Sequence, residues 1–371
     1  MASSKSKPSI LFIAPLPPPV HGSAMMSQYI KDSKLINKAF NCDYVNLSTS
    51  RRMDEIGKKP LLKLARFIWA YCRVLGKLMC HRYDLCYLAI TCHGIGFLKD
   101  APFVLLCKLF RHKIVIHQHN KGMSRDVERW PYRWLLPWVY RDTKVILLSW
   151  RLYPDIKKIV EKNQILICPN GIPETFQGEL ETKRHNRIPH LLFLSNLMVS
   201  KGVIVLLDAL EILKNKGYSF ICYFVGGETA EMDAGQFASE VEKRGLTDTV
   251  IYVGRKYGEE KDKIYSEADV FVFPTYYHNE CFPLVLLEAM QHSLPIVSTD
   301  VGGIADIVEN NVNGYVCETR NVDILAQKLS ELIIDESLRL RMGESGHEKY
   351  KHQYTIKVFE ANIKEILEAS M

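Results

Sequence analysis

Short apolar segments rich in Val, Ile, Leu and Phe recur along the chain, and stretches with helical periodicity separate them. Uninterrupted apolar runs of this kind are typical of strands buried on both faces of a parallel sheet. The predicted strands in the first half span residues 10–14, 85–89, 113–117, 144–148 and 165–168. Those in the second half span residues 191–194, 220–225, 250–253, 270–273 and 295–298. The alternation predicts an α/β fold with two sheets of βαβ units.

A polar stretch at residues 177–187 separates the two series of strands and follows the sequence PNGIP at residues 169–173. Proline, glycine and polar side chains without periodicity indicate a linker. We therefore expect two Rossmann-like domains, residues 1–170 and 171–351, with a cleft between them. The final helix, predicted at about 355–369, is long enough to cross back, so residues from about 352 to 371 are assigned to the first domain.

A basic amphipathic helix is predicted at residues 61–80, with its charges on one face and apolar or aromatic residues elsewhere. It lies in a region where nine basic residues stand against Asp54 and Glu55: Arg51, Arg52, Lys58, Lys59, Lys63, Arg66, Arg73, Lys77 and Arg82. Such a helix either lies on an anionic membrane surface or packs on a sheet with a basic stripe facing solvent. Aromatic residues interleaved with arginines favour the membrane: Trp130, Tyr132, Trp134, Trp138 and Tyr140 with Arg129, Arg133 and Arg141.

Composition narrows the class of protein. No segment reaches the roughly 18 uncharged apolar residues that a membrane span requires, and the N-terminus lacks the pattern of a secretory signal. The ten cysteines form no CxxC pair and no Cys/His cluster at metal-binding spacing, which indicates reduced thiols. We expect a cytoplasmic protein, either free or peripheral on the inner face of the membrane, with no nucleic-acid partner and no metal.

Two features of the first half are candidates for ligand binding. Gly22 follows the first strand in a strand, loop, helix opening, but GxGxxG is lacking, so it either lets a ligand approach or simply permits a tight turn. His117 and His119 end the third predicted strand, at the edge of the sheet where open α/β sheets bind ligands. Each is either a ligand-binding group or a hydrogen-bonded core histidine.

The stretch from Tyr276 to Val301 is the most informative in the second half. Glu280 precedes a predicted helix whose first residue is Pro283, and Glu288 lies within it. Because this helix is largely apolar, both carboxylates need partners. The hydroxyl groups of a ribose or a hexose would satisfy them. Alternatively, Glu280 caps the helix and Glu288 pairs with a core Arg or Lys.

Several motifs then fall into one order. They are PNGI at 169–172, SNLMVSKG at 195–202, FVGG at 224–227, ADVFVFPTYYHNECFPLVLLEAM at 268–290 and PIVSTDVGGIADIVENNVNGYV at 295–316. The set resembles the family 4 glycosyltransferases, which are retaining enzymes with the GT-B fold. The resemblance is strongest from residue 190 to 320. It implies transfer of a glycosyl unit from a nucleotide sugar, UDP- or GDP-linked, to a hydroxyl group of a glycan or lipid-linked glycan, as in cell-surface polysaccharide assembly.

The resemblance also implies roles for residues that match the family's motifs. Glu288 would bind the ribose of the donor and Glu280 its sugar hydroxyls, while Lys201 would hold the diphosphate and assist the leaving group. His119 would lie near the transferred sugar, so the catalytic set is His119, Lys201 and Glu280. The remaining donor-side residues are Gly22, Asn196, Arg255, Cys281, Phe282, Pro283 and Leu284, and the acceptor-side residues are His21 and His117.

One position departs from the family pattern. Asn196 stands where the family usually has an arginine, so one diphosphate cation is missing, and Arg255 or a basic residue of the first domain would replace it. The resemblance implies no metal and no cofactor beyond the nucleotide-sugar substrate. The alternatives are a sugar-nucleotide epimerase on the same fold and a noncatalytic sugar-nucleotide-binding protein.

Overall fold

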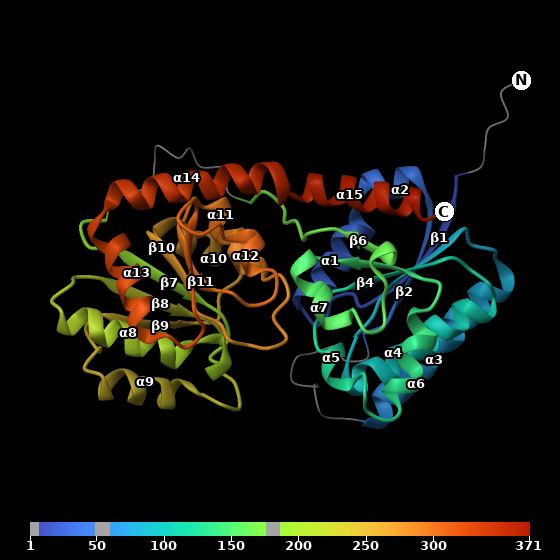
Figure 1. Ribbon diagram of the computed structural model, residues 1–371, viewed down its shortest axis with the longest axis horizontal. Coiled ribbons are helices and arrows are strands. Elements are labelled where there is room, and N and C mark those ends of the chain that lie inside the picture. The colour runs from blue at the N-terminus through green and yellow to red at the C-terminus, as the bar shows by residue number, and fades with distance from the viewer. Residues whose placement is uncertain (1–6, 49–59, 176–185) are drawn as a thin grey trace, which may run out of the picture. The chain divides into compact units, whose positions relative to one another are not determined.

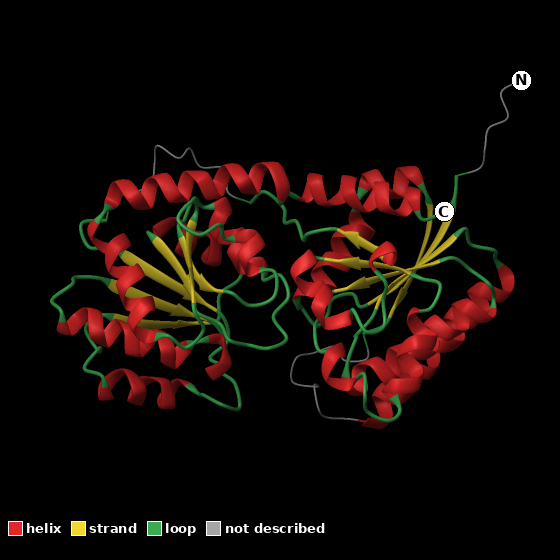
Figure 2. Ribbon diagram, viewed as in Figure 1, coloured by secondary structure: helices red, strands yellow, loops and turns green. Residues whose placement is uncertain are grey.

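The computed structural model describes residues 7–48, 60–175 and 186–371 (Figure 1). The chain divides into unit 1, residues 1–171 with 356–371, and unit 2, residues 172–355. The division drawn from the sequence lies at 170/171 and 351/352. Each unit contains one parallel six-stranded sheet with helices on both faces (Figure 2). The predicted linker up to residue 185 and the charged residues at 51, 52, 54, 55, 58 and 59 lie outside the described residues.

The sheet of unit 1 has the strand order β2-β1-β3-β4-β5-β6. Its strands are β1 (Ser9–Ala14), β2 (Asn41–Asn46), β3 (Leu85–Ala89), β4 (Ile114–Gln118), β5 (Lys144–Leu147) and β6 (Ile165–Ile167). The chain moves outward in one direction from β1 to β2 and in the other from β3 onward, so the strand order reverses between β1 and β3. Loops that leave neighbouring strands at such a point diverge and open a crevice at their carboxyl ends.

Helices cover this sheet, and the last helix of the chain returns to it. They are α1 (Gly22–Asp32), α2 (Lys34–Ala39), α3 (Pro60–Cys80), α4 (Gly94–Leu109), α5 (Met123–Asp126), α6 (Tyr132–Tyr140), α7 (Tyr153–Ile156) and α15 (Ile356–Ala369). α15 packs against α2 within unit 1. The helix predicted at 61–80 is confirmed as α3. α3 packs against α4, and α4 against α6 (Figure 1).

The sheet of unit 2 has the strand order β12-β11-β10-β7-β8-β9. Its strands are β7 (His190–Leu194), β8 (Ile221–Val225), β9 (Val250–Gly254), β10 (Val270–Phe273), β11 (Ile296–Thr299) and β12 (Gly314–Cys317). In order of appearance this is the 3-2-1-4-5-6 arrangement of dinucleotide-binding domains, read from the other edge. The strand order reverses between β7 and β10, which places the crevice at their carboxyl ends.

The helices of unit 2 pack on both faces of its sheet. They are α8 (Val203–Asn215), α9 (Ala234–Lys243), α10 (Gly258–Glu267), α11 (Leu284–Gln291), α12 (Ile304–Ile307), α13 (Val322–Ile334) and α14 (Glu336–Gln353). Short 3-10 turns occur at Trp150–Leu152 and Lys162–Gln164 in unit 1 and at Val199–Lys201 in unit 2. Over the part of the chain that the structure describes, no helix is long and apolar enough to cross a bilayer.

Candidate functional site

Lys201 and Glu280 meet at the point where the strand order of unit 2 reverses. Lys201 ends the 3-10 turn that follows β7, and Glu280 lies in the loop after β10. The Nζ atom of Lys201 lies 2.5 Å from Oε2 of Glu280, and the two side chains are only 18% and 11% exposed. The ammonium group also lies 4.6 Å from the ring centre of Tyr277 and 5.5 Å from that of Phe273. One largely buried cation is thus held by a carboxylate and two aromatic faces.

Backbone contacts fix Lys201 against the end of β10. The amide of Tyr276 donates to the carbonyl of Ser200 at 2.9 Å. Gly202, the residue after Lys201, has φ of +90°, and a Cβ atom there would lie 2.3 Å from the carbonyl oxygen of Pro274. Only glycine satisfies both the left-handed conformation and this close approach, so the turn that presents Lys201 depends on Gly202.

Glu280 is held by two glycines that follow β11, Gly302 and Gly303. The amide of Gly303 donates to the carbonyl of Cys281 at 2.6 Å. Gly302 has φ of +61°, and a Cβ atom there would lie 2.3 Å from the carbonyl oxygen of Glu280. The loops after β10 and β11 therefore pack backbone against backbone, and this contact sets the position of Glu280.

The helix start after Glu280 differs in detail from the prediction. Pro283 is the N-terminal cap of α11 rather than its first residue, and no side chain caps this end. The alternative in which Glu280 caps the helix is therefore wrong, and Glu280 pairs with Lys201 instead. The predicted donor-side residues that follow Glu280 are largely shielded from solvent: Cys281, Phe282 and Pro283 are buried, and Leu284 is partly buried.

Glu288 has two partners on α10. Oε1 lies 2.7 Å from Nζ of Lys261, and the hydroxyl of Tyr265 donates to Oε2 at 3.0 Å. Glu288 therefore pairs with a lysine, as in the alternative to a hydroxyl ligand, although the side chain of Lys261 is partly exposed rather than in the core. Neither Lys261 nor Tyr265 was predicted as a site residue. Their four-residue spacing on one helix was visible in the sequence, but nothing there shows that α10 faces α11.

Asn196 and Arg255 come together at the turn after β8. The side-chain oxygen of Asn196 accepts a hydrogen bond from the amide of Gly227 at 3.2 Å, and the amide of Leu197 donates to the carbonyl of Gly227 at 2.8 Å. The guanidinium group of Arg255 lies directly on Gly227, where a Cβ atom would come within 2.1 Å of Nη2. Arg255 thus reaches the loop that contains Asn196. Over the described residues no carboxylate pairs with this arginine.

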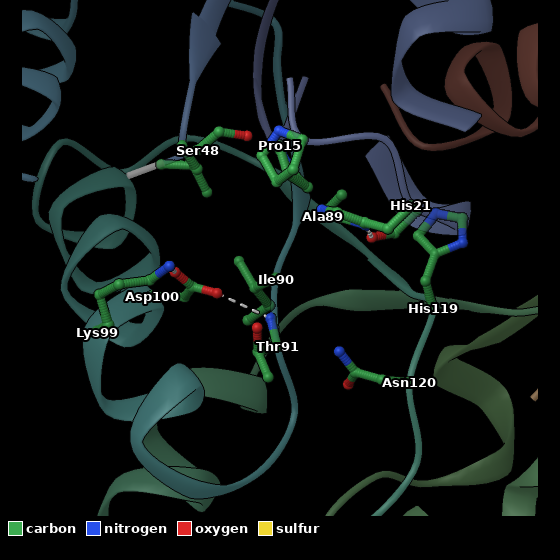
Figure 3. A pocket seen from close by; sticks show the side chains of 13 residues that line it. Pro15, His21, Ser48, Ala89, Ile90, Thr91, Lys99, Asp100, His119 and Asn120 are labelled. Carbon is green, nitrogen blue, oxygen red and sulfur yellow. Dashed lines mark hydrogen bonds and ion pairs between the residues drawn. The ribbon is translucent and has the colours of Figure 1, made fainter. Parts of the chain in front are cut away.

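Unit 1 contains a pocket of about 220 Å³ at the carboxyl ends of β1, β2, β3 and β4. Its lining includes His21 and His119 (Figure 3). On the opposite side, Asp100 of α4 accepts a hydrogen bond from the amide of Thr91 at 2.9 Å and lies 3.3 Å from Nζ of Lys99. The pocket therefore has imidazole rings on one side and the Lys99–Asp100 ion pair on the other. Its full lining is Pro15, Pro19, His21, Ser23, Leu47, Ser48, Ala89, Ile90, Thr91, Lys99, Asp100, His119 and Asn120.

The predicted histidines occupy two layers. His119 lines the pocket, whereas His117 is fully buried behind it, with ring centres 4.0 Å apart. Nδ1 of His117 lies 2.6 Å from the hydroxyl of Tyr87. Burial, and then the neighbouring His21, lowers the pKa of His119 to about 3. Burial and then His119 lower the pKa of His117 well below its ordinary value, so both rings are neutral at pH 7.

The first loop of unit 1 differs from expectation. Serine is a common helix cap and Ser23 stands at the start of α1, but the cap is His21, whose Nδ1 accepts from the amide of Ala24 at 3.4 Å. Burial and then Lys99 lower the pKa of His21, which keeps Nδ1 available as an acceptor. Gly22 is the first residue of α1 and has no positive φ, so the tight-turn interpretation is wrong. A Cβ atom at Gly22 would meet nothing within 4 Å, which leaves open space beside the pocket residue His21.

Over the described ranges, no group of three or more His, Cys, Asp or Glu side chains is placed to hold a metal ion. The candidate site contains three cationic side chains, Lys201, Lys261 and Arg255. A glutamate neutralises each of the two lysines, and within the described residues no carboxylate pairs with Arg255.

The chain matches a family model described as "Glycosyl transferases group 1" over residues 180–349. Among curated proteins it is similar to the capsular polysaccharide biosynthesis glycosyltransferase CapM of Staphylococcus aureus, with 28% identity over 58% of this chain and 59% of CapM. It is also similar to the amylovoran biosynthesis glycosyltransferase AmsK of Erwinia amylovora, with 29% identity over 64% of this chain and 57% of AmsK. The chain thus spans about three fifths of the length of these relatives.

Two solved structures resemble the whole fold. HepE of Anabaena, determined in complex with UDP, superposes with a TM-score of 0.76 at 16% identity, covering 98% of this chain and 100% of HepE. The sucrose-phosphate synthase of Thermosynechococcus elongatus superposes with a TM-score of 0.75 at 17% identity, covering 98% and 99%. At such low identity the likeness concerns the fold. Residues 180–349 are therefore similar to the glycosyl transferases group 1 model, and the chain has the two-unit α/β fold of GT-B glycosyltransferase structures.

Proposed function

We propose that the protein is a retaining, metal-independent glycosyltransferase that moves a sugar from a nucleotide-sugar donor to a hydroxyl group of a glycan or lipid-linked glycan. The observation that supports it best is the Lys201–Glu280 pair, because it puts a cation and a carboxylate together where the strand order of unit 2 reverses. A sugar diphosphate needs a cation for its phosphates and an acceptor for its hydroxyls. Relatives such as CapM and AmsK, named for polysaccharide biosynthesis, support the same class of product.

In this proposal unit 2 binds the donor. Lys201 binds the diphosphate and stabilises the charge that develops on it as the sugar leaves. Glu280 accepts hydrogen bonds from hydroxyls of the transferred sugar, and Glu288 accepts them from the ribose. Arg255, which has no carboxylate partner within the described residues, adds positive charge beside the loop that contains Asn196.

The reaction balances without a protein nucleophile. The bond between the anomeric carbon and the diphosphate oxygen breaks, and a bond from the acceptor hydroxyl to the same carbon forms on the same face of the sugar. A donor phosphate oxygen takes the acceptor proton, so the products are a glycoside and a nucleoside diphosphate. The protein supplies charge and orientation rather than a covalent intermediate.

Unit 1 is proposed to bind the acceptor through its pocket. His119 and His21 have lowered pKa values, so both rings are uncharged. His119 offers one acceptor and one donor nitrogen to hydroxyl groups, whereas Nδ1 of His21 already accepts from Ala24 and leaves Nε2–H as a donor. The Lys99–Asp100 pair offers both a cation and a carboxylate at the opposite wall. His117 acts only through His119, because it is fully buried.

Exposed tryptophans on α3 and around α6 support a peripheral position on an anionic membrane. Trp69 on α3 is 60% exposed, and Trp130, Trp134 and Trp138 at α6 are between 60% and 80% exposed. Arginines stack on two of these rings: Arg73 on Trp69 at 4.7 Å and Arg133 on Trp134 at 4.9 Å. Tryptophan and arginine side by side suit the boundary between lipid headgroups and acyl chains. A protein bound at this boundary would reach a lipid-linked acceptor on the inner membrane face.

The direct test is a panel of UDP- and GDP-linked sugars with and without a membrane extract that contains lipid-linked glycans. UDP is included because HepE was solved with it, and GDP because a mycobacterial relative is named as GDP-mannose-dependent. Release of nucleoside diphosphate that requires the acceptor, with an α- or β-linkage matching that of the donor, supports the proposal. An isomerised donor would indicate an epimerase. Binding without turnover for every pair would indicate a noncatalytic protein.

A further inference from the structure

Glu288 is oriented by two side chains from a single helix. Lys261 and Tyr265 stand four residues apart on α10, so they project from the same face. Lys261 contacts Oε1 at 2.7 Å and Tyr265 contacts Oε2 at 3.0 Å. Each carboxylate oxygen therefore has its own partner, and the plane of the carboxylate is set before any ligand binds.

Tyr265 is a fixed donor. Its ring is fully buried and stacks on His292 with ring centres 5.2 Å apart and an angle of 13°. Burial, and then the charge of Glu288, raise the pKa of Tyr265 well above its ordinary value, so the hydroxyl stays protonated at neutral pH. The hydroxyl shares its single hydrogen between Oε2 of Glu288 and the carbonyl of Val285, which lies 3.2 Å away and one turn before Glu288 on α11. Ring and hydroxyl are therefore both constrained.

The two partners do not use up the carboxylate. Each oxygen of an ionised carboxylate accepts about two hydrogen bonds, so one site on each oxygen remains for a further donor. The side chain of Glu288 is 22% exposed and that of Lys261 is 23% exposed, so this group can be reached from solvent. Two adjacent hydroxyl groups on one ring, as in a ribose, present two donors to two such oxygens.

The charge of Lys261 has a second effect. A nucleoside diphosphate carries several negative charges, and Glu280 and Glu288 would both repel it if they were unpaired. Lys201 neutralises Glu280 and Lys261 neutralises Glu288. The pairing reduces the negative charge that Glu280 and Glu288 present to the diphosphate, and both carboxylates can still accept hydrogen bonds from hydroxyl groups.

We propose that Lys261 and Tyr265 are positioning residues for nucleotide recognition, which hold Glu288 so that it selects a ribose over a 2′-deoxyribose. The inference rests on the proposed function, in which Glu288 binds the ribose of the donor. A purely structural contact that ties α10 to α11 would use the same hydrogen bonds, but it would not depend on the 2′-hydroxyl group of the ligand.

The test is the ratio of Kd for 2′-deoxy-UDP to Kd for UDP, measured by titration calorimetry, with the GDP pair used if the wild-type protein binds GDP more tightly. Wild type is expected to show a ratio of about ten or more, because an unpaired polar site rejects a ligand that lacks the hydroxyl. Lys261→Met and Tyr265→Phe should bring the ratio to within about threefold of one, mainly by weakening UDP binding. Lys261→Arg should keep the wild-type ratio, as should Lys263→Met, a matched control on the same helix.

Two results would overturn the inference: a wild-type ratio in both Lys261→Met and Tyr265→Phe, or an equal weakening of both ligands. If Tyr265→Phe does not fold, Lys261→Met decides alone, because its side chain is partly exposed. Glu288→Gln separates this inference from the proposed function. If wild type binds no nucleotide, or if Glu288→Gln leaves the ratio unchanged, the proposed role of Glu288 fails. If Glu288→Gln removes the preference and the α10 variants keep it, only the present inference fails.

Discussion

Lys201 and Glu280 stand 79 residues apart in the sequence and 2.5 Å apart in space, and each follows one of the two strands between which the order of the unit 2 sheet reverses. The pair is largely removed from solvent, so each member depends on the other for compensation. This relationship makes the two residues the first targets for mutation.

Lys201→Ala is expected to lower kcat by about 100-fold or more, because the leaving diphosphate loses its cation. It should also destabilise the fold by roughly 1–3 kcal/mol, since Glu280 is left largely buried without a partner. Urea unfolding and steady-state kinetics measure the two effects separately. In the double variant Lys201→Ala/Glu280→Gln the stability should return while activity stays low. Wild-type turnover in Lys201→Ala would refute the site.

Arg255→Ala is expected to weaken nucleoside diphosphate binding by about 10- to 100-fold, because the charge that lies on Gly227 is lost. Asn196→Arg should restore much of that affinity in the Arg255→Ala background, since the side chain of Asn196 bonds to the same glycine. Lys263→Ala, an exposed lysine on α10, is the matched control for removal of one charge. Equal losses for a nucleoside and for its diphosphate would instead place Arg255 on the base.

His117 and His119 predict a specific pH profile of stability. Their pKa values in the folded state lie below the ordinary value near 6.5, so below that pH the unfolded chain binds protons that the folded chain does not. Stability should therefore be unaffected by these rings above about pH 6.5 and fall as the pH decreases toward 3, by up to about 1.4 kcal/mol per pH unit for each ring. His119→Asn should flatten the decline in urea titrations from pH 7 to pH 4.5. An identical slope in this variant would contradict the assignment.

The exposed tryptophans on α3 and around α6 predict binding to anionic vesicles. Trp134→Ser combined with Trp138→Ser should reduce sedimentation with vesicles of phosphatidylglycerol by about tenfold or more, since each indole that inserts into the membrane removes apolar area from water. Trp150→Ser is the control, because Trp150 is also exposed, at 52%, but lies outside both helices. Binding should weaken with added salt, as expected when Arg73 and Arg133 contribute. Equal loss in the control would mean that these tryptophans have no special role.

Much of the fold was readable in the sequence, for a physical reason. Runs such as residues 85–89 and 270–273 are buried on both faces, so their apolar pattern is continuous, and both match strands β3 and β10. Two edge strands were missed. β2 is NCDYVN, with polar residues along most of its length, and β12 begins at Gly314, so neither has the apolar run of an inner strand.

The candidate site could be predicted only in part. Sequence motifs single out Glu280, Glu288 and Lys201. Their partners, in contrast, depend on which elements pack against one another in the fold. Lys261 is one of two lysines on α10, and only its contact with Glu288 distinguishes it from Lys263. The cap at His21 was likewise hidden, because histidine is a rare cap and Ser23 lies two residues beyond it.

The Lys201–Glu280 contact also has a consequence for turnover. Any diphosphate that binds Lys201 must compete with a carboxylate that is permanently attached beside it, so part of the binding free energy is offset when the ligand displaces that contact. When the nucleoside diphosphate leaves, the same contact re-forms and compensates the lysine. In the proposed reaction, where substrate and product share the same diphosphate, Glu280 would thus act as a built-in competitor of the product and favour weak product inhibition.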